Sequence, residues 1–239
     1  MMTEQQIVLT IFVTAPITYL IGSIPFGLIL GLARGVDIRK HGSGNIGATN
    51  AGRVLGMRYF WYAFFLDFLK GFLPVLVCDL LITNLNGPIW IPLITAAAAI
   101  SGHLFPIYLG FKGGKGVATS FGAMLGIWPV FTLSALGAVG VFAVVFMSKR
   151  IISISSMVAA ISFAVLVPLV GHFLSPIPGV IQPESWHELM PLLIASWLLC
   201  AMVIWKHRSN IRRLLTGTEP KMGESASTAP IKNDEPQTK

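Results

Sequence analysis

The feature that most constrains this chain is a series of apolar runs, several of which reach the roughly 20 residues that a helix needs to cross a bilayer core. Inside that core every backbone N–H and C=O must be bonded internally, so the runs are expected to be helices. Only 11% of the 239 residues are charged, against about 25% in a typical soluble domain. The sequence therefore predicts an all-α, polytopic integral membrane protein, with apolar runs at 7–32, 59–83, 89–109, 117–128, 130–147, 151–170 and 189–205.

All the lysines and arginines except Lys70, which is inside the 59–83 run, lie between these runs or after the last one, and their distribution predicts the topology. They occur in the 33–58 connection, around 112–115, at 149–150 and after Trp205, whereas the 84–88 and 171–188 connections contain none. By the positive-inside rule the basic connections are cytoplasmic. The N-terminus is then expected outside and the C-terminus inside.

The number of crossings depends on residues 117–147, because both ends of this segment are basic and should lie on the same side. Pro129 interrupts the segment, and proline removes a helix donor and clashes with the preceding turn. Two short helices there would give seven crossings. The alternative is a five-crossing chain in which 117–147 forms a re-entrant or interfacial hairpin.

The net charge of +7 is explained by these cytoplasmic connections, so no nucleic-acid partner is predicted. Residues 1–221 are interpreted as a single membrane domain, and the polar 222–239 segment as a disordered cytoplasmic tail. The two cysteines, Cys78 and Cys200, lie in apolar runs without metal-ligand spacing. No metal and no cofactor are predicted.

The first basic connection contains a glycine-rich segment, HGSGNIGATNAGR, from His41 to Arg53. It formally matches G-x-G-x-x-G, but a membrane span follows it instead of a βαβ unit, which excludes a dinucleotide fold. Closely spaced glycines still allow backbone N–H groups to converge on an anion, and an arginine offers a planar fork for phosphate. A flexible glycine turn is the plainer alternative. The candidate residues are Gly42, Ser43, Gly44, Asn45 and Arg53.

A second glycine-rich segment, GHLFPIYLGFKGGKGVATS, runs from Gly102 to Ser120. It is not a Walker A loop, because Lys115 is followed by glycine instead of serine or threonine. Two lysines and a helix N-terminus nevertheless suit an anion. Ordinary positive-inside lysines are the alternative, although they leave the glycines unexplained. The candidate residues are Lys112, Gly113, Gly114, Lys115 and Gly116.

Further polar residues lie at the ends of the later spans and inside one span. His207 and Asn210 are three residues apart, on one helix face, in a basic segment that could alternatively bind anionic lipid. Ser153, at the cytoplasmic mouth of the 151–170 run, is a candidate phosphate-binding residue, although serines in membrane helices more often pack against or bond to a neighbouring helix. Asp67 and Lys70 are predicted to form a structural ion pair in the membrane, with a catalytic pair as the less favoured alternative.

Six blocks, in order, together resemble the PlsY family of bacterial acyl-phosphate:glycerol-3-phosphate acyltransferases. They are GSIPFG (22–27), GSGNIGATNAGR (42–53), LDFLKG (66–71), GHLFPIYLGFKGGKGVAT (102–119), KRIISISS (149–156) and a tail with His207, Asn210 and Glu219. The resemblance implies a seven-helix fold. It assigns catalysis to Ser43, Arg53, His207 and Asn210, binding of glycerol-3-phosphate to the glycines and lysines at 112–116, and a structural role to Glu219.

The implied reaction transfers a fatty acyl group from acyl-phosphate to the 1-hydroxyl of sn-glycerol-3-phosphate, giving lysophosphatidic acid and phosphate. It would be the first step of phospholipid synthesis, at the cytoplasmic face of the bacterial inner membrane. Acyl-phosphate, glycerol-3-phosphate and membrane lipid are the implied partners, together with a candidate contact to the enzyme that produces acyl-phosphate. Acyl-chain preference, oligomeric state and the route of the acyl chain are not predicted.

The chemistry of the residues is compatible with this reaction. An acyl-phosphate is already activated, so the protein must chiefly hold two anions together and align a hydroxyl with a carbonyl. Two hypotheses remain for the hydroxyl proton: His207 accepts or relays it, or a substrate phosphate takes it. An acyl-CoA or acyl-carrier-protein acyltransferase is disfavoured because no H-x-x-x-x-D box occurs. A phosphate-ester transporter is disfavoured because the glycine loops gather on one predicted membrane side.

Overall fold

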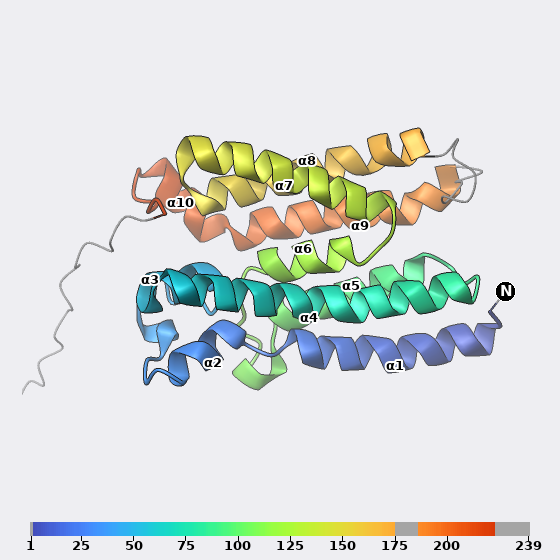
Figure 1. Ribbon diagram of the computed structural model, residues 1–239, viewed down its shortest axis with the longest axis horizontal. Helices are drawn as coiled ribbons and strands as arrows, with labels where there is room; N and C mark the ends of the chain where they lie inside the picture. The colour runs from blue at the N-terminus through green and yellow to red at the C-terminus, as the bar shows by residue number, and fades with distance from the viewer. Residues whose placement is uncertain (1, 175–185, 223–239) are drawn as a thin grey trace, which may run out of the picture.

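The computed structural model describes residues 2–174 and 186–222 of the chain (Figure 1). Within this part the fold is all-helical, without β-strands. Short 3₁₀ helices at Ile38–Lys40 and Ile107–Leu109 accompany the α-helices. The α-helices are α1 (Glu4–Gly22), α2 (Phe26–Leu32), α3 (Ala48–Leu55), α4 (Met57–Asn84), α5 (Trp90–Leu104), α6 (Val117–Leu125), α7 (Val130–Lys149), α8 (Ile152–Leu174), α9 (Trp186–Lys206) and α10 (Arg208–Leu215).

The long helices form two layers, with α1, α4 and α5 in one and α7, α8 and α9 in the other (Figure 1). The short helix α6 lies between the layers and packs closely on α4. A Cβ on Gly71 would lie 2.2 Å from the carbonyl oxygen of Thr119, and one on Gly122 would lie 2.1 Å from that of Phe68. Glycine at both contacts therefore allows the two backbones to touch, as small residues do between membrane helices.

The main apolar core fills the space between the two layers. Phe131 of α7 and Phe163 of α8 meet edge to face, with ring centroids 5.1 Å apart, and both are buried. Val75 of α4, Ile127 and Leu192 of α9 belong to the same cluster. In contrast, large apolar side chains on the outer faces are exposed, as expected of a surface that faces lipid.

Five segments in the described part of the chain are long and apolar enough to cross a membrane. They are Glu4–Leu32, Trp90–Leu109, Val130–Lys149, Ile152–Leu174 and Leu189–Lys206. The 28-residue α4 is not among them, and it contains Asp67, Lys70 and Asp79. The predicted 59–83 run thus corresponds to a helix of spanning length that also carries charges.

The region 117–147 differs from the prediction of two short helices. Helix α6 has 9 residues and ends at Leu125, so it is about 14 Å long, less than half of a bilayer core. Helix α7 has 20 residues, enough to span. The two helices differ in length because the helical break at residues 126–129 lies near the start of the apolar segment, so most of the segment belongs to α7. The five-crossing alternative placed α7 in a re-entrant hairpin, whereas it is one of the five spanning segments.

The predicted site segments gather at one end of the bundle. Helices α3 and α10 lie at the end opposite the N-terminus (Figure 1). Most of the predicted outside connection 171–188 and nearly all of the predicted tail 222–239 fall outside the described residues.

Candidate active site

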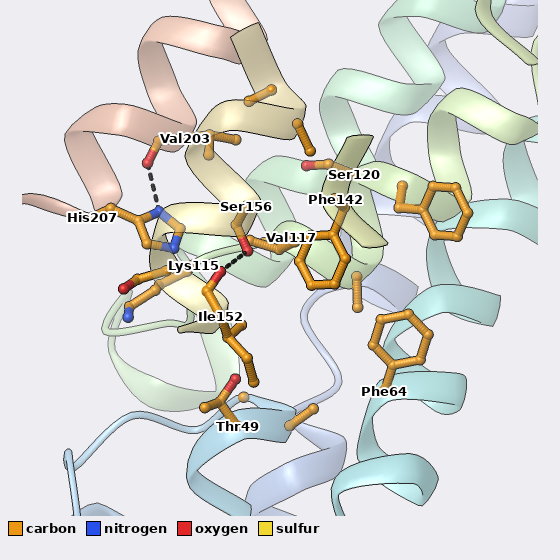
Figure 2. Close-up of a pocket in the computed structure, with 18 of the residues that line it drawn as sticks. Thr49, Phe64, Lys115, Val117, Ser120, Phe142, Ile152, Ser156, Val203 and His207 are labelled. Atoms are coloured by element: carbon orange, nitrogen blue, oxygen red, sulfur yellow. Dashed lines mark hydrogen bonds between the residues drawn. The ribbon is translucent and has the colours of Figure 1, made fainter. Parts of the chain in front are cut away.

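A cavity of about 310 Å³ opens at this end and continues between the two layers. Figure 2 shows His207 and Lys115 on one side of it and the rings of Phe142 and Phe64 on the other. The cavity thus has a polar end and an apolar limb. The polar end includes Ser43, Asn45, Arg53, Lys115, Ser153, His207, Asn210 and Glu219. The apolar limb includes Phe60, Phe64, Phe121, Met124, Val139, Phe142, Phe163 and Leu199.

Ser43 is held in place by the amide of Asn50 in α3. The Asn50 Oδ1 atom accepts hydrogen bonds from the Ser43 backbone N–H at 2.8 Å and from its hydroxyl at 3.1 Å. The Asn50 Nδ2 atom donates to the carbonyl oxygens of Ile38 and His41, so this fully buried amide organises the whole turn. Because the Ser43 hydroxyl donates to an amide and not to a base, this geometry does not activate it as a nucleophile.

Lys115 follows the Gly113–Gly114 pair and precedes α6. Gly116 caps this helix with a left-handed backbone (φ 80°), a conformation that favours glycine. The Lys115 ammonium donates a hydrogen bond to the Asn210 side-chain oxygen. Burial lowers the pKa of Lys115 to about 8, Arg213 and Arg53 act in the same direction, and the charge of Glu219 opposes them.

His207 joins α9 to α10 and is buried. Its Nδ1 atom lies 2.8 Å from the carbonyl oxygen of Val203 (Figure 2). Since a carbonyl oxygen only accepts, Nδ1 carries the proton and Nε2 has a free lone pair. Burial, together with the charge of Lys115, lowers the pKa of His207 to about 4. The imidazole is therefore neutral at physiological pH.

Glu219 connects the C-terminal segment to the site. Its Oε1 atom accepts hydrogen bonds from Ser153 at 2.8 Å and from Asn210 at 2.6 Å, and its Oε2 atom accepts one from Arg213 at 2.7 Å. Burial disfavours the carboxylate, but these hydrogen bonds outweigh that effect and keep the pKa of Glu219 below its ordinary value. Ser153, predicted to bind phosphate, thus donates to Glu219 in this structure.

Asp67 also lines the cavity, behind the polar end, and its carboxylate lies 2.7 Å from the Lys70 ammonium. His103, which sequence reasoning did not single out, lines the cavity beside Asp67. Nothing in the sequence around a histidine near a helix end predicts that its side chain will line a cavity. The role of Asn50 in organising the turn around Ser43 likewise follows only from the folded chain.

The remaining predicted residues do not line the cavity. These are Gly42, Gly44, Lys70, Lys112, Gly113 and Gly114. Gly42 and Gly44 have φ of 60° and 67° and form the turn around Ser43. Lys112 is exposed. Within residues 2–174 and 186–222, no group of three or more His, Cys, Asp or Glu side chains could hold a metal ion.

The charges at the polar end favour an anionic ligand. Arg53, Lys115 and Arg213 are cationic, and Glu219 supplies a carboxylate close to them. Cations and backbone donors in a partly desolvated pocket attract phosphate strongly. The adjoining apolar limb is suited to a hydrocarbon chain. The combination fits an amphiphilic ligand with a phosphate group.

Comparisons with known proteins agree with this geometry. Residues 12–217 match the family model for glycerol-3-phosphate acyltransferase. The glycerol-3-phosphate acyltransferase of Acholeplasma laidlawii is 38% identical over 226 residues, which cover 91% of this chain and 95% of the relative. That of Geobacter sulfurreducens is 44% identical over 204 residues, covering 85% and 93%.

Two solved structures share the fold. A crystal structure of PlsY, an integral membrane glycerol 3-phosphate acyltransferase in its glycerol 3-phosphate form, is 37% identical with a TM-score of 0.71, covering 89% of this chain and 96% of that chain. The lysophosphatidic acid form is 36% identical with a TM-score of 0.70, covering 89% and 95%. A family match over most of the chain, close relatives and a common fold lead to one conclusion: the chain belongs to the PlsY family of glycerol-3-phosphate acyltransferases.

Proposed function

We propose that the protein transfers a fatty acyl group from acyl-phosphate to the 1-hydroxyl of sn-glycerol-3-phosphate, forming lysophosphatidic acid and releasing phosphate. The observation that supports this most is the cavity itself, in which a cationic end continues directly into an apolar limb. One space can therefore hold two phosphate groups at the polar end and an acyl chain between the helix layers.

The polar end brings two anions together in spite of their mutual repulsion. Arg53 and Lys115 come from segments far apart in the sequence, and both line the cavity. Lys115 and the adjoining Gly116 would hold glycerol-3-phosphate, while Ser43 and Arg53 would hold the phosphate of the donor. Fixing both reactants in this way supplies the alignment that makes attack of the hydroxyl on the carbonyl effectively intramolecular.

The acyl chain would lie in the apolar limb between α4 and α6 on one side and α7 and α8 on the other. Phe64, Phe121, Phe142 and Phe163 line this limb. Its far end lies between the layers, so the carbonyl of the donor would stay near the polar end. This placement gives the acyl route that sequence alone does not provide.

The reaction needs no covalent intermediate on the protein. The 1-hydroxyl oxygen bonds to the acyl carbon, the bond from that carbon to the phosphate oxygen breaks, and the hydroxyl proton must be taken up. A phosphate monoester has a second pKa near 6, whereas the pKa of His207 is about 4. The phosphate that leaves carries the electron pair of the broken bond and is a stronger base than either, so it takes up the hydroxyl proton. We assign His207 to substrate binding through its free Nε2.

A direct assay tests the donor. The detergent-purified protein would receive glycerol-3-phosphate with palmitoyl-phosphate or, as the matched control, palmitoyl-CoA. We expect lysophosphatidic acid from palmitoyl-phosphate only. Product from palmitoyl-CoA alone would show that the donor is wrong, and absence of product from both would refute the proposed enzyme.

For topology we propose seven crossings. Helix α4 adds one to the five spanning segments, and α6 adds the other together with the residues on either side of it, because a helix enclosed between the two layers need not span the lipid core by itself. The N-terminus would lie outside and residues 1–221 would form one domain of a bacterial inner-membrane protein, with the site facing the cytoplasm. Cysteines introduced at Asn86 and Asn45 test this, because Cys78 and Cys200 are buried. An impermeant thiol reagent added to whole cells should label position 86 but not 45. The reverse pattern would invert the topology.

Contact with the enzyme that produces acyl-phosphate stays a prediction from the family resemblance. Membrane lipid is the expected surrounding of the exposed apolar helix faces. Neither point affects the assay above, which uses the isolated protein and a donor supplied directly.

A further inference from the structure

Three buried ionisable side chains connect α4 to the loop that carries Lys115. Asp67, Lys70 and His103 are only 2%, 4% and 4% exposed. The Asp67 Oδ1 atom lies 2.7 Å from Lys70 Nζ and 3.6 Å from His103 Nδ1. Lys70 Nζ also donates to the carbonyl oxygen of Ile24 at 2.7 Å. Ionisable groups at such depth are costly, and their retention indicates a specific task.

The other edge of the His103 imidazole contacts the glycine loop. A Cβ on Gly114 would lie 2.1 Å from His103 Nε2 and 3.0 Å from two ring carbons, so the Gly114 backbone lies directly on the ring. The Gly114 N–H also donates to the His103 carbonyl oxygen at 3.1 Å. Two contacts from one residue therefore fix the position of Gly114.

Both imidazole nitrogens of His103 have protein groups as their neighbours. Its Nδ1 faces Asp67, its Nε2 faces Gly114, and the residue after Gly114 is Lys115. The Nε2 side of the ring therefore connects His103 to the loop that carries Lys115. An apolar side chain could fill the same space without burying polar atoms, so packing alone does not account for a histidine here.

We infer that His103 is a positioning residue: its ring lies between Asp67 and the glycine loop and holds Gly114 so that the Lys115 ammonium lies at the phosphate end of the cavity. The inference deepens the proposed function and rests on it. Displacing the loop by about 1 Å would misplace the ammonium, and a misplacement of that size can cost about 100-fold in rate or affinity. Lys70 is the counter-ion of Asp67 beside the ring.

The test is a double-mutant cycle between His103 and Lys115 in the full-length, detergent-purified protein. His103→Ala should raise the KM for glycerol-3-phosphate about tenfold, while the KM for palmitoyl-phosphate changes less than about twofold. In a Lys115→Ala background the same change should add less than about twofold, because the ring acts through the ammonium that is already gone.

His103→Asn is the second variant, because its amide keeps a donor near Nδ1 for Asp67 but withdraws the ring from Gly114. If His103→Ala does not fold, His103→Asn is expected to fold, and it should also raise the KM for glycerol-3-phosphate. The inference is overturned if the two substitutions at 103 and 115 act independently, if both substrates are affected equally, or if neither KM changes.

A binding measurement separates this inference from the proposed function. Glycerol-3-phosphate should raise the unfolding temperature of the wild type, and His103→Asn should abolish most of that shift. This measurement needs no acyl donor. A wild type that binds glycerol-3-phosphate but does not use palmitoyl-phosphate would contradict the proposed donor only, whereas equal shifts in wild type and variant would contradict the positioning role only.

Discussion

The pKa of Lys115 leads to a quantitative prediction for substrate binding. Burial lowers this pKa from 10.5 to about 8, and the charges of Arg213 and Arg53 act in the same direction. Only the protonated ammonium attracts phosphate, so affinity should be lost as the pH rises through 8. The protonated fraction falls from about nine tenths at pH 7 to about one tenth at pH 9. The KM for glycerol-3-phosphate should therefore increase about tenfold over this interval.

Other groups do not obscure this change. The substrate phosphate has its second pKa near 6 and is a dianion throughout the interval. The pKa of His207 is about 4, so its charge is constant there as well. The matched control is Lys115→Arg, whose guanidinium stays charged to beyond about pH 12 and should give a KM that hardly varies between pH 7 and 9.

The assay measures initial rates of lysophosphatidic acid formation at several pH values, with both substrates varied. The KM for palmitoyl-phosphate at each pH shows whether the effect is confined to glycerol-3-phosphate. A wild-type KM that is constant from pH 7 to 9 would refute the reasoning, as would a Lys115→Arg protein with the same pH dependence as the wild type.

Further predictions concern the remaining site residues. Ser43→Ala and Arg53→Ala should each lower kcat/KM at least about 30-fold at unchanged yield of folded protein, measured by turnover and gel filtration; near-normal turnover would remove these residues from the site. Gly113→Ala should mainly raise the KM for glycerol-3-phosphate, since its Cβ would lie 2.2 Å from the His103 carbonyl oxygen. Glu219→Gln should lower the unfolding temperature at pH 7 by about 4 °C. Removing 224–239 should leave activity within about twofold, and a larger loss would give the tail a role.

The helical bundle was predictable because apolar length is a direct physical requirement of the membrane. The place of α6 was not. Its apolar run of 117–128 resembles a short span, and only the packing of Gly71 against Thr119 shows a half-length helix pressed between two layers. Periodicity and composition indicate that a segment will lie in an apolar environment, but they do not indicate which helix it will pack against.

The site was predictable to the extent that its chemistry is local. Glycines and cations near Ser43 and Lys115 indicate an anion site within a few residues, and the cavity contains both side chains. Asn50 and His103 act over longer distances. Asn50 reaches back 12 residues to Ile38, and His103 contacts Gly114 after an intervening 3₁₀ turn. Such contacts depend on how the chain folds, and local sequence motifs do not predict them.

The carboxylate of Glu219 at the centre of an anion site requires its own explanation. Arg53, Lys115 and Arg213 would repel one another in an empty cavity, and Glu219 offsets part of that repulsion while the site stays cationic for substrate. It also orients Asn210, whose side-chain oxygen is left to accept from Lys115. Because the folded-state pKa of Glu219 is below its usual 4.5, this stabilisation is present above pH 4.5 and is lost as the pH falls through the folded value. The stability difference between wild type and Glu219→Gln should therefore shrink as the pH falls below 4.5, and a difference that stays constant below that pH would show that the charge is not what stabilises the segment.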